Sequence, residues 1–230
     1  MMHSHGLRAS SAAATPGIVT TGLVLNLDAG NAASYPGTGT TWTDLSGNGN
    51  TGTLVGSPTY SSANGGSIVF NGTSAYVTVN DSASIRFGTG DYTAEVFVYA
   101  NDISAVGNGR IVISKAYTGL EFVFYGNTMY ITPPVTTAGT GWAANTWYHI
   151  VSSRLNGVQT SYRNAVSIRT ATVTTDISTL GTPFIIGARP PVPPVGHFQG
   201  SIPIVRLYNR ALSAAEVSQN FNALRGRYGV

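Results

Sequence analysis

The sequence predicts an all-β fold in which two antiparallel sheets pack as a sandwich, with one short helix near the C-terminus. Apolar and polar residues alternate with a period of two in about a dozen short segments, as expected of strands that are buried on one face. Gly-rich and Asn-rich turn signals separate these segments, and so many strands are enough for two packed sheets. With 230 residues and no cysteine, the chain suits one domain without disulfide bonds.

The predicted strands follow from this alternation. They cover residues 22–27, 67–70, 75–79, 93–99, 110–114, 120–125, 128–132, 147–154, 160–162, 168–173, 184–186 and 201–207. Three short turn signals, at 71–72, 126–127 and 156–157, predict hairpins between their flanking strands. In the segment 93–99, Glu95, Phe97 and Tyr99 should share one face.

A helix is predicted to begin at Ser213, because Ser213 and Glu216 have the spacing of a capping box. One apolar stripe follows, made of Val217, Phe221 and Leu224. Gly226 is predicted to end the helix in the left-handed conformation. The stripe indicates that the helix lies against the sandwich.

Composition excludes several classes of function. The net charge is +3, only 9% of residues are charged, and Lys115 is the single lysine. Because no basic stripe exists, nucleic acid is not an expected partner. No run of 18 apolar residues is present, so no membrane span is expected. Residues 1–21 lack the apolar core of a signal peptide and are predicted to form an N-terminal arm, followed by one domain over 22–230.

Five strings of residues carry a family resemblance over most of the chain. They are 22–25 with 28–31, 41–48, 68–72, 147–150 and 206–213. In this order they resemble the concanavalin A-like (laminin G-like) jelly-roll superfamily. The resemblance implies a two-sheet antiparallel jelly roll.

The opening residues 17–20, with the strings at 27–31 and 35–37, are similar to versions carried by tailed bacteriophages. That similarity implies a non-catalytic virion structural protein, made in the bacterial host cytoplasm, and capsid decoration or cementing is the leading role. The expected partners are other virion proteins (major capsid or tail subunits), with a second copy of the chain and a surface glycan as further candidates. The first alternative is a carbohydrate-binding receptor module of a tail or fibre, and the second is a glucanase-like hydrolase.

Catalysis and metal binding are not expected. Glycoside hydrolysis needs two carboxylates beside the scissile bond, and the glucanases of the resembled family place them two residues apart on one strand. Glu95 and Glu121 each lack such a neighbour. The aspartates usual in the family are missing near Thr73 and Pro203, so no calcium site, other metal or cofactor is carried over. The segment 44–49 resembles the start of a calcium loop, but a structural turn is the preferred interpretation.

A small set of residues remains as candidate sites. Trp142 and Tyr117 are loop aromatics that could stack on a sugar, with Asn145 as a polar neighbour. For Trp142, packing on the sandwich edge is the preferred interpretation, and sugar stacking is the alternative. In the arm, Arg8, Ile18 and Val19 are candidates for anchoring the protein to a neighbouring subunit.

Overall fold

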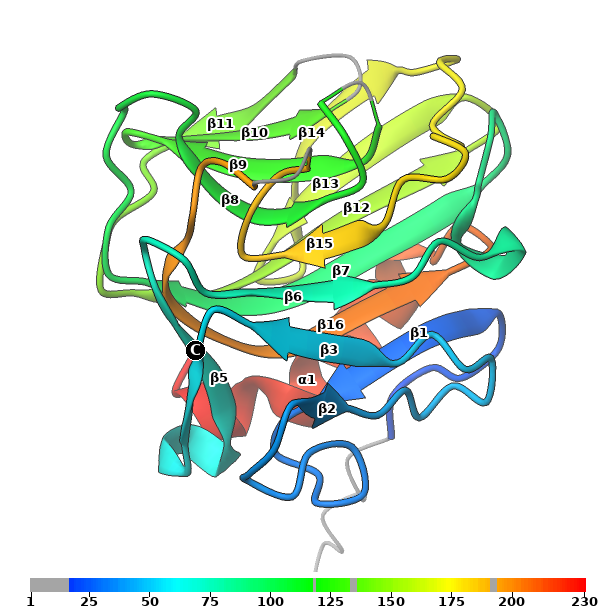
Figure 1. Cartoon of the computed structure of the whole chain (residues 1–230). Helices are drawn as coiled ribbons and strands as arrows, with labels where there is room; N and C mark the ends of the chain where they lie inside the picture. Colours follow the sequence, from blue (N-terminus) through cyan, green and yellow to red (C-terminus); the bar gives the residue numbers. More distant parts are fainter. Residues whose placement is uncertain (1–16, 118, 133–135, 191–193) are drawn as a thin grey trace, which may run out of the picture.

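Two antiparallel sheets lie face to face in the computed structural model, which describes residues 17–117, 119–132, 136–190 and 194–230 (Figure 1). This arrangement confirms the predicted all-β jelly-roll sandwich. One sheet, called sheet B, faces the viewer in Figure 1, and the other, sheet A, lies behind it.

Sheet A has the strand order β14-β13-β12-β7-β16-β5-β4, and β1 also pairs with β16. Its strands are β1 (Leu23–Asp28), β4 (Thr59–Ser61), β5 (Ser67–Asn71), β7 (Tyr92–Ala100), β12 (Trp147–Leu155), β13 (Val158–Arg163), β14 (Val166–Thr172) and β16 (Gln199–Tyr208). The hairpin predicted at 156–157 is confirmed, because β12 pairs with β13 there.

Sheet B has the order β11-β10-β9-β8-β15-β6-β3-β2. Its strands are β2 (Thr41–Trp42), β3 (Gly52–Val55), β6 (Tyr76–Val79), β8 (Arg110–Ser114), β9 (Glu121–Tyr125), β10 (Thr128–Thr132), β11 (Thr136–Thr140) and β15 (Phe184–Ile186). The predicted meander is confirmed as β8-β9-β10. Two short 3₁₀ turns, η1 (Ala63–Gly65) and η2 (Ala83–Ile85), lie between strands.

One predicted hairpin was wrong. Strands β5 and β6, on either side of Asn71 and Gly72, belong to different sheets. The Asn71 side chain accepts hydrogen bonds from the backbone N–H groups of Thr73, Ser74 and Ala75. The turn therefore carries the chain from sheet A across to sheet B.

The hydrophobic core fills the space between the sheets. In β7, Ala94, Val96 and Val98 belong to it. The alternate residues Glu95, Phe97 and Tyr99 share the other face of β7, as predicted. That face is the outer face of sheet A, where Glu95 and Phe97 are nevertheless fully buried.

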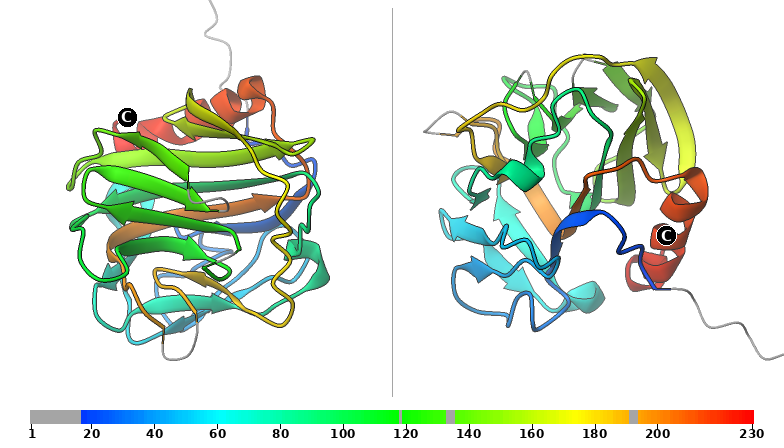
Figure 2. Two further views of the ribbon diagram at one scale, coloured as in Figure 1. Left: turned by 90° about the horizontal axis from the view of Figure 1, so that it is seen from above. Right: turned by 90° about the vertical axis from the view of Figure 1, so that its right-hand side faces the viewer.

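Helix α1 (Ala214–Tyr228) explains that burial, because it covers part of the outer face of sheet A (Figure 2). The predicted capping box of Ser213 and Glu216 is confirmed. The predicted stop at Gly226 was wrong, because the helix continues to Tyr228 and its left-handed cap is Gly229. Tyr228 packs against Phe97 with ring centroids 4.8 Å apart, and this contact holds the last turn in place.

Candidate functional site

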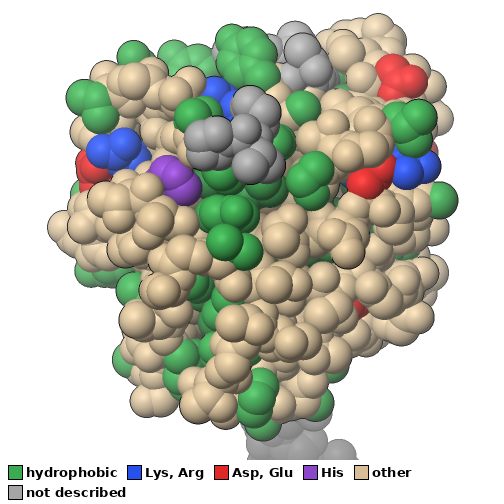
Figure 3. Space-filling view, in the orientation of Figure 1, with side chains coloured by type: hydrophobic (Ala, Val, Ile, Leu, Met, Phe, Trp, Pro, Cys, Tyr) green, Lys and Arg blue, Asp and Glu red, His purple; other side chains and the backbone are tan. Residues whose placement is uncertain are grey.

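A pocket of about 360 Å³ opens on the outer face of sheet B. Its described lining residues are Gly107, Asn108, Tyr117, Glu121, Val123, Tyr125, Tyr130, Thr132 and Arg189. Strand alternation creates it: Phe122 and Phe124 of β9 point into the core, so the residues between and beside them point outward. Figure 3 shows that charged side chains are sparse on this face of the molecule.

Three tyrosines form the aromatic part of the pocket. Tyr117 and Tyr125 are 60% and 41% exposed. The ring of Tyr125 meets that of Tyr130 edge to face, with centroids 6.4 Å apart. Such rings offer apolar faces on which a sugar or another flat apolar surface can stack, while their hydroxyls remain available for hydrogen bonds.

The polar part of the pocket is an ion pair joined to an amide. Arg189 Nε and Nη2 donate to the two carboxylate oxygens of Glu121 at 2.5 and 2.6 Å. Arg189 Nη1 donates to Asn108 Oδ1 at 3.1 Å. The guanidinium carbon lies 4.9 Å from the ring centroid of Tyr117, in cation–π geometry. Glu121 is fully buried, so the pair is fixed at the base of the pocket.

The loop that carries Tyr117 is fastened by Lys115, which is 2% exposed. Lys115 Nζ donates to Asp81 Oδ1 at 2.6 Å and to the backbone carbonyl of Thr182 at 3.1 Å. Burial lowers the pKa of Lys115, although Asp81 opposes that shift. Ala116 has a φ of 134°, a conformation that side chains rarely adopt, so the backbone is strained beside the exposed tyrosine.

The structure does not bring the three predicted binding residues together. Trp142 is 2% exposed and packs edge-on against Phe124 and Tyr148. The guanidinium of Arg163 lies over its ring at 4.8 Å, so no face of Trp142 is open to a ligand. Asn145 accepts a hydrogen bond from Asn101 in a turn. Of the three, only Tyr117 lines the pocket.

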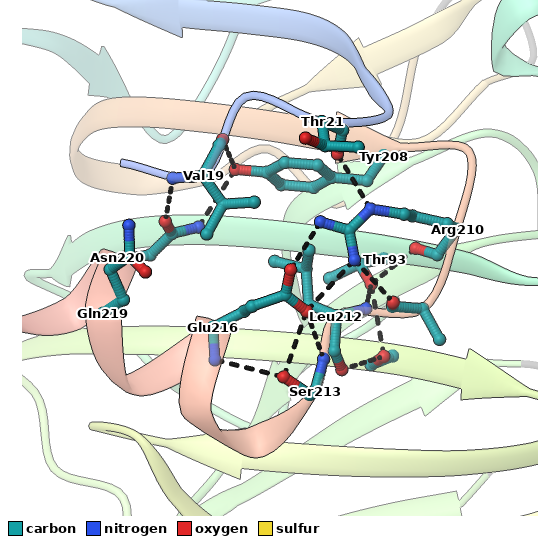
Figure 4. A network of polar contacts seen from close by, with 12 residues as sticks. Val19, Thr21, Thr93, Tyr208, Arg210, Leu212, Ser213, Glu216, Gln219 and Asn220 are labelled. Carbon is teal, nitrogen blue, oxygen red and sulfur yellow. Dashed lines mark hydrogen bonds and ion pairs between the residues drawn. The ribbon is translucent and has the colours of Figure 1, made fainter. Parts of the chain in front are cut away.

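The described part of the predicted arm, residues 17–21, packs on its own domain (Figure 4). The Val19 N–H donates to Asn220 Oδ1 at 2.8 Å, and the Val19 carbonyl accepts from the Tyr208 hydroxyl at 3.1 Å. Val19 is buried, and Ile18 packs against the cluster under α1. Both residues are therefore engaged within this chain. Arg8 lies outside the described residues.

The two glutamates considered for catalysis lie on opposite sides of the molecule. Glu95 is buried on the outer face of sheet A, where His149 Nε2 and Arg206 Nη1 lie 3.0 and 3.3 Å from its Oε1. Burial raises the pKa of Glu95, but Arg206 and His149 outweigh it and hold that pKa below its ordinary value. Among the described lining residues of the pocket, Glu121 is the only carboxylate. The described pocket thus lacks a carboxylate pair for glycoside hydrolysis.

The loop that resembled a calcium site is organised by hydrogen bonds. Asp44 Oδ1 accepts from the N–H groups of Asn26 and Ser46, and Oδ2 accepts from the Ser46 hydroxyl and the Asn50 N–H. Across the described residues, no three His, Asp or Glu side chains gather as metal ligands. Nor does any helix in the described part of the chain have the length and apolarity to cross a membrane.

The fold is a two-sheet β-sandwich with a pocket on the outer face of one sheet. Residues 71–218 match the concanavalin A-like lectin/glucanases superfamily, so the chain belongs to that superfamily. Comparison with curated protein sequences finds no match.

Solved structures share the fold at low sequence identity. The binding domain of Paraclostridial Mosquitocidal Protein 1 has a TM-score of 0.70 and 16% identity, over 88% of this chain and 52% of that one. The binding domain of botulinum neurotoxin DC, in complex with SialylT, has a TM-score of 0.69 and 13% identity, over 89% and 52%. This chain thus spans about half the length of these toxin domains. Domain 4 of AbnA, an extracellular arabinanase from Geobacillus stearothermophilus in complex with arabinotriose, has a TM-score of 0.65 and 20% identity, over 86% and 97%.

Proposed function

We propose that this protein is a non-catalytic glycan-binding module and that the pocket on sheet B is its binding site. The observation that carries the proposal is the combination of exposed tyrosine rings with a fixed polar base. Tyr117 and Tyr125 offer stacking faces, and Arg189 and Asn108 lie beside them as hydrogen-bonding groups. Carbohydrate recognition needs this pattern, because the apolar face of a sugar stacks on aromatic rings and its hydroxyls form hydrogen bonds with positioned polar groups.

Two further points support binding rather than hydrolysis. The single carboxylate among the described lining residues, Glu121, has both oxygens engaged by Arg189. A carboxylate held in this way is poorly suited to deliver a proton to a leaving group. Domains of the same fold are bound to arabinotriose in one solved structure and to SialylT in another.

The test is a glycan array probed with the labelled protein, followed by titration of each hit. We expect Tyr117→Ala and Tyr125→Ala to weaken binding of a hit about fivefold each, because a lost stacking contact costs on the order of 1 kcal/mol. Tyr99→Ala, on the outer face of the other sheet, is the matched control and should bind normally. If no glycan binds, or if the Tyr99 variant loses binding equally at an unchanged melting temperature, the proposal is wrong.

A virion structural role, with capsid decoration or cementing as its form, is a second proposal that rests on the sequence resemblance to bacteriophage modules. It is compatible with glycan binding, because a module displayed on a particle can bind a host glycan. Its test is mass spectrometry of purified particles from a phage that encodes this chain. Absence of the protein from intact particles would contradict it.

A further inference from the structure

The charge of the pocket is balanced at its base. Glu121 and Arg189 form a two-point ion pair that is 0% exposed on the glutamate and 9% exposed on the arginine. The pair contributes one negative and one positive charge. Its net charge is therefore zero, in a place where water screens charges poorly.

Three of the five N–H groups of Arg189 are engaged within the protein. Its Nε–Nη2 edge, which matches a carboxylate in two-point geometry, is already occupied by Glu121. Its Nη1 donates to Asn108, and one face of the guanidinium is stacked by Tyr117. An acidic sugar that took this two-point edge would have to displace Glu121 and leave that carboxylate buried without a partner, which is costly.

Two cations near these residues in the sequence, one on β8 and one in the loop after it, also have carboxylate partners. Arg110, two residues after Asn108, is paired with Asp102. Lys115, at the base of the Tyr117 loop, is paired with Asp81, which also binds Arg86. Neither Arg110 nor Lys115 lines the pocket, so Arg189 is the only cation among its described lining residues.

We propose that the pocket selects neutral sugars and rejects acidic ones, and that Glu121 determines this specificity by occupying Arg189. The inference rests on the proposed glycan-binding function and deepens it. A neutral sugar needs only the tyrosine faces and single hydrogen bonds to groups such as Asn108, and the ion pair does not have to open. A sialic or uronic acid brings a carboxylate that loses hydration and meets Glu121 instead of a free cation.

The experiment compares matched ligands that differ in one acidic sugar. Lactose and 3′-sialyllactose form one pair, and a neutral arabinan or glucan oligosaccharide and an oligogalacturonate form another. The neutral member that the wild-type protein binds defines the working pair. We expect its acidic counterpart to bind at least about tenfold more weakly, as when a buried ion pair must be broken. This comparison needs no variant.

Two variants then change the charge at the base of the pocket, and the first of them keeps nearly the same side-chain shape. Glu121→Gln frees the guanidinium, and it should raise binding of the acidic ligand roughly tenfold through a charge-assisted hydrogen bond while changing neutral binding little. The gain should decrease in about 0.5 M salt, because screening weakens the new charge interaction. The double variant Glu121→Gln/Arg189→Gln is neutral again and should lose the gain. Melting temperatures confirm that each variant is folded.

The outcomes separate the two proposals. If no variant binds any glycan, the proposed function fails. If the wild-type protein binds acidic sugars as well as neutral ones, or if a folded Glu121→Gln variant keeps the wild-type preference, glycan binding stands and the role of Glu121 is refuted.

Discussion

Asn220 of helix α1 donates a hydrogen bond of 2.7 Å to Glu95, which is buried in the middle of sheet A. Through its oxygen, the same amide accepts the Val19 N–H at 2.8 Å. One side chain thus joins the helix, the sheet and the N-terminal segment.

The first prediction concerns this amide. We expect Asn220→Ala to lower the free energy of unfolding by about 2–4 kcal/mol, because it removes partners from a buried carboxylate and a buried N–H together. Urea denaturation measures the loss. The matched control is Gln219→Ala, which removes only a hydrogen bond to the Gly17 carbonyl at the surface and should cost about 0.5 kcal/mol or less. Equal losses for the two variants would contradict the role of Asn220.

The second prediction is a pH dependence at the start of α1. A hydrogen bond from Arg210 lowers the pKa of Glu216 from 4.5 to about 2 in the folded protein. A lowered folded-state pKa stabilises the protein above the unfolded value, and the benefit is lost as the pH falls from 4.5 towards 2.

We therefore expect Glu216→Gln to be less stable than the wild-type protein at pH 7 by about 1 kcal/mol, since the pair is partly exposed. Most of the difference should disappear by pH 2.5. Urea midpoints at pH 7, 4 and 2.5 give the result, with Gln219→Ala as a control whose effect does not depend on pH. A difference that stays constant with pH would show that the charge of Glu216 is unimportant.

The third prediction concerns Arg154, a fully buried cation that is satisfied by carbonyls. It donates to the backbone oxygens of Gly88, Gly90 and Thr175 and lies over the ring of Tyr92 at 4.9 Å. A lysine cannot reach three separated carbonyls from one nitrogen. Arg154→Lys should therefore lower the stability by about 2–4 kcal/mol, and no less than Arg154→Met, because the lysine leaves a buried charge under-paired. Full stability of the lysine variant would refute this interpretation.

The fourth prediction concerns calcium. Because each Asp44 oxygen already accepts two hydrogen bonds, we expect no strong cation binding at the loop. The melting temperature should then be the same with 5 mM Ca²⁺ and with a chelator, to within about 1 °C, since a ligand of the native state must raise it. A clear rise with Ca²⁺ that is absent in Asp44→Asn would place a calcium site there.

Local sequence patterns were sufficient for the two-sheet fold and the start of the helix. Alternation alone places Phe122 and Phe124 on the core face of β9 and Glu121 and Tyr125 on the opposite face, which lines the pocket. The end of the helix could not be predicted from Gly226, because it depends on the distant contact between Tyr228 and Phe97. Local propensity is a weak determinant where tertiary packing opposes it.

The pocket on sheet B was harder to predict, because its polar base joins residues that are 68 positions apart. Glu121 has no local partner, and nothing near it in the sequence indicates Arg189. Trp142 was a candidate because it is an aromatic residue in a predicted loop with polar neighbours, but Arg163 of a different strand covers its ring. The outward alternation of Tyr125 and Tyr130 was the one local signal that could have indicated the pocket.

The burial of Lys115 has a practical consequence. It is the only lysine in the chain and is 2% exposed, with its amine held by Asp81. An amine-reactive reagent at neutral pH should therefore modify the folded protein almost solely at its terminal α-amine. The chain enters the domain at Gly17 beside α1, on the side of the sandwich away from the sheet B pocket. Biotin or a fluorophore introduced in this way gives a uniformly labelled protein in which the pocket residues are unmodified.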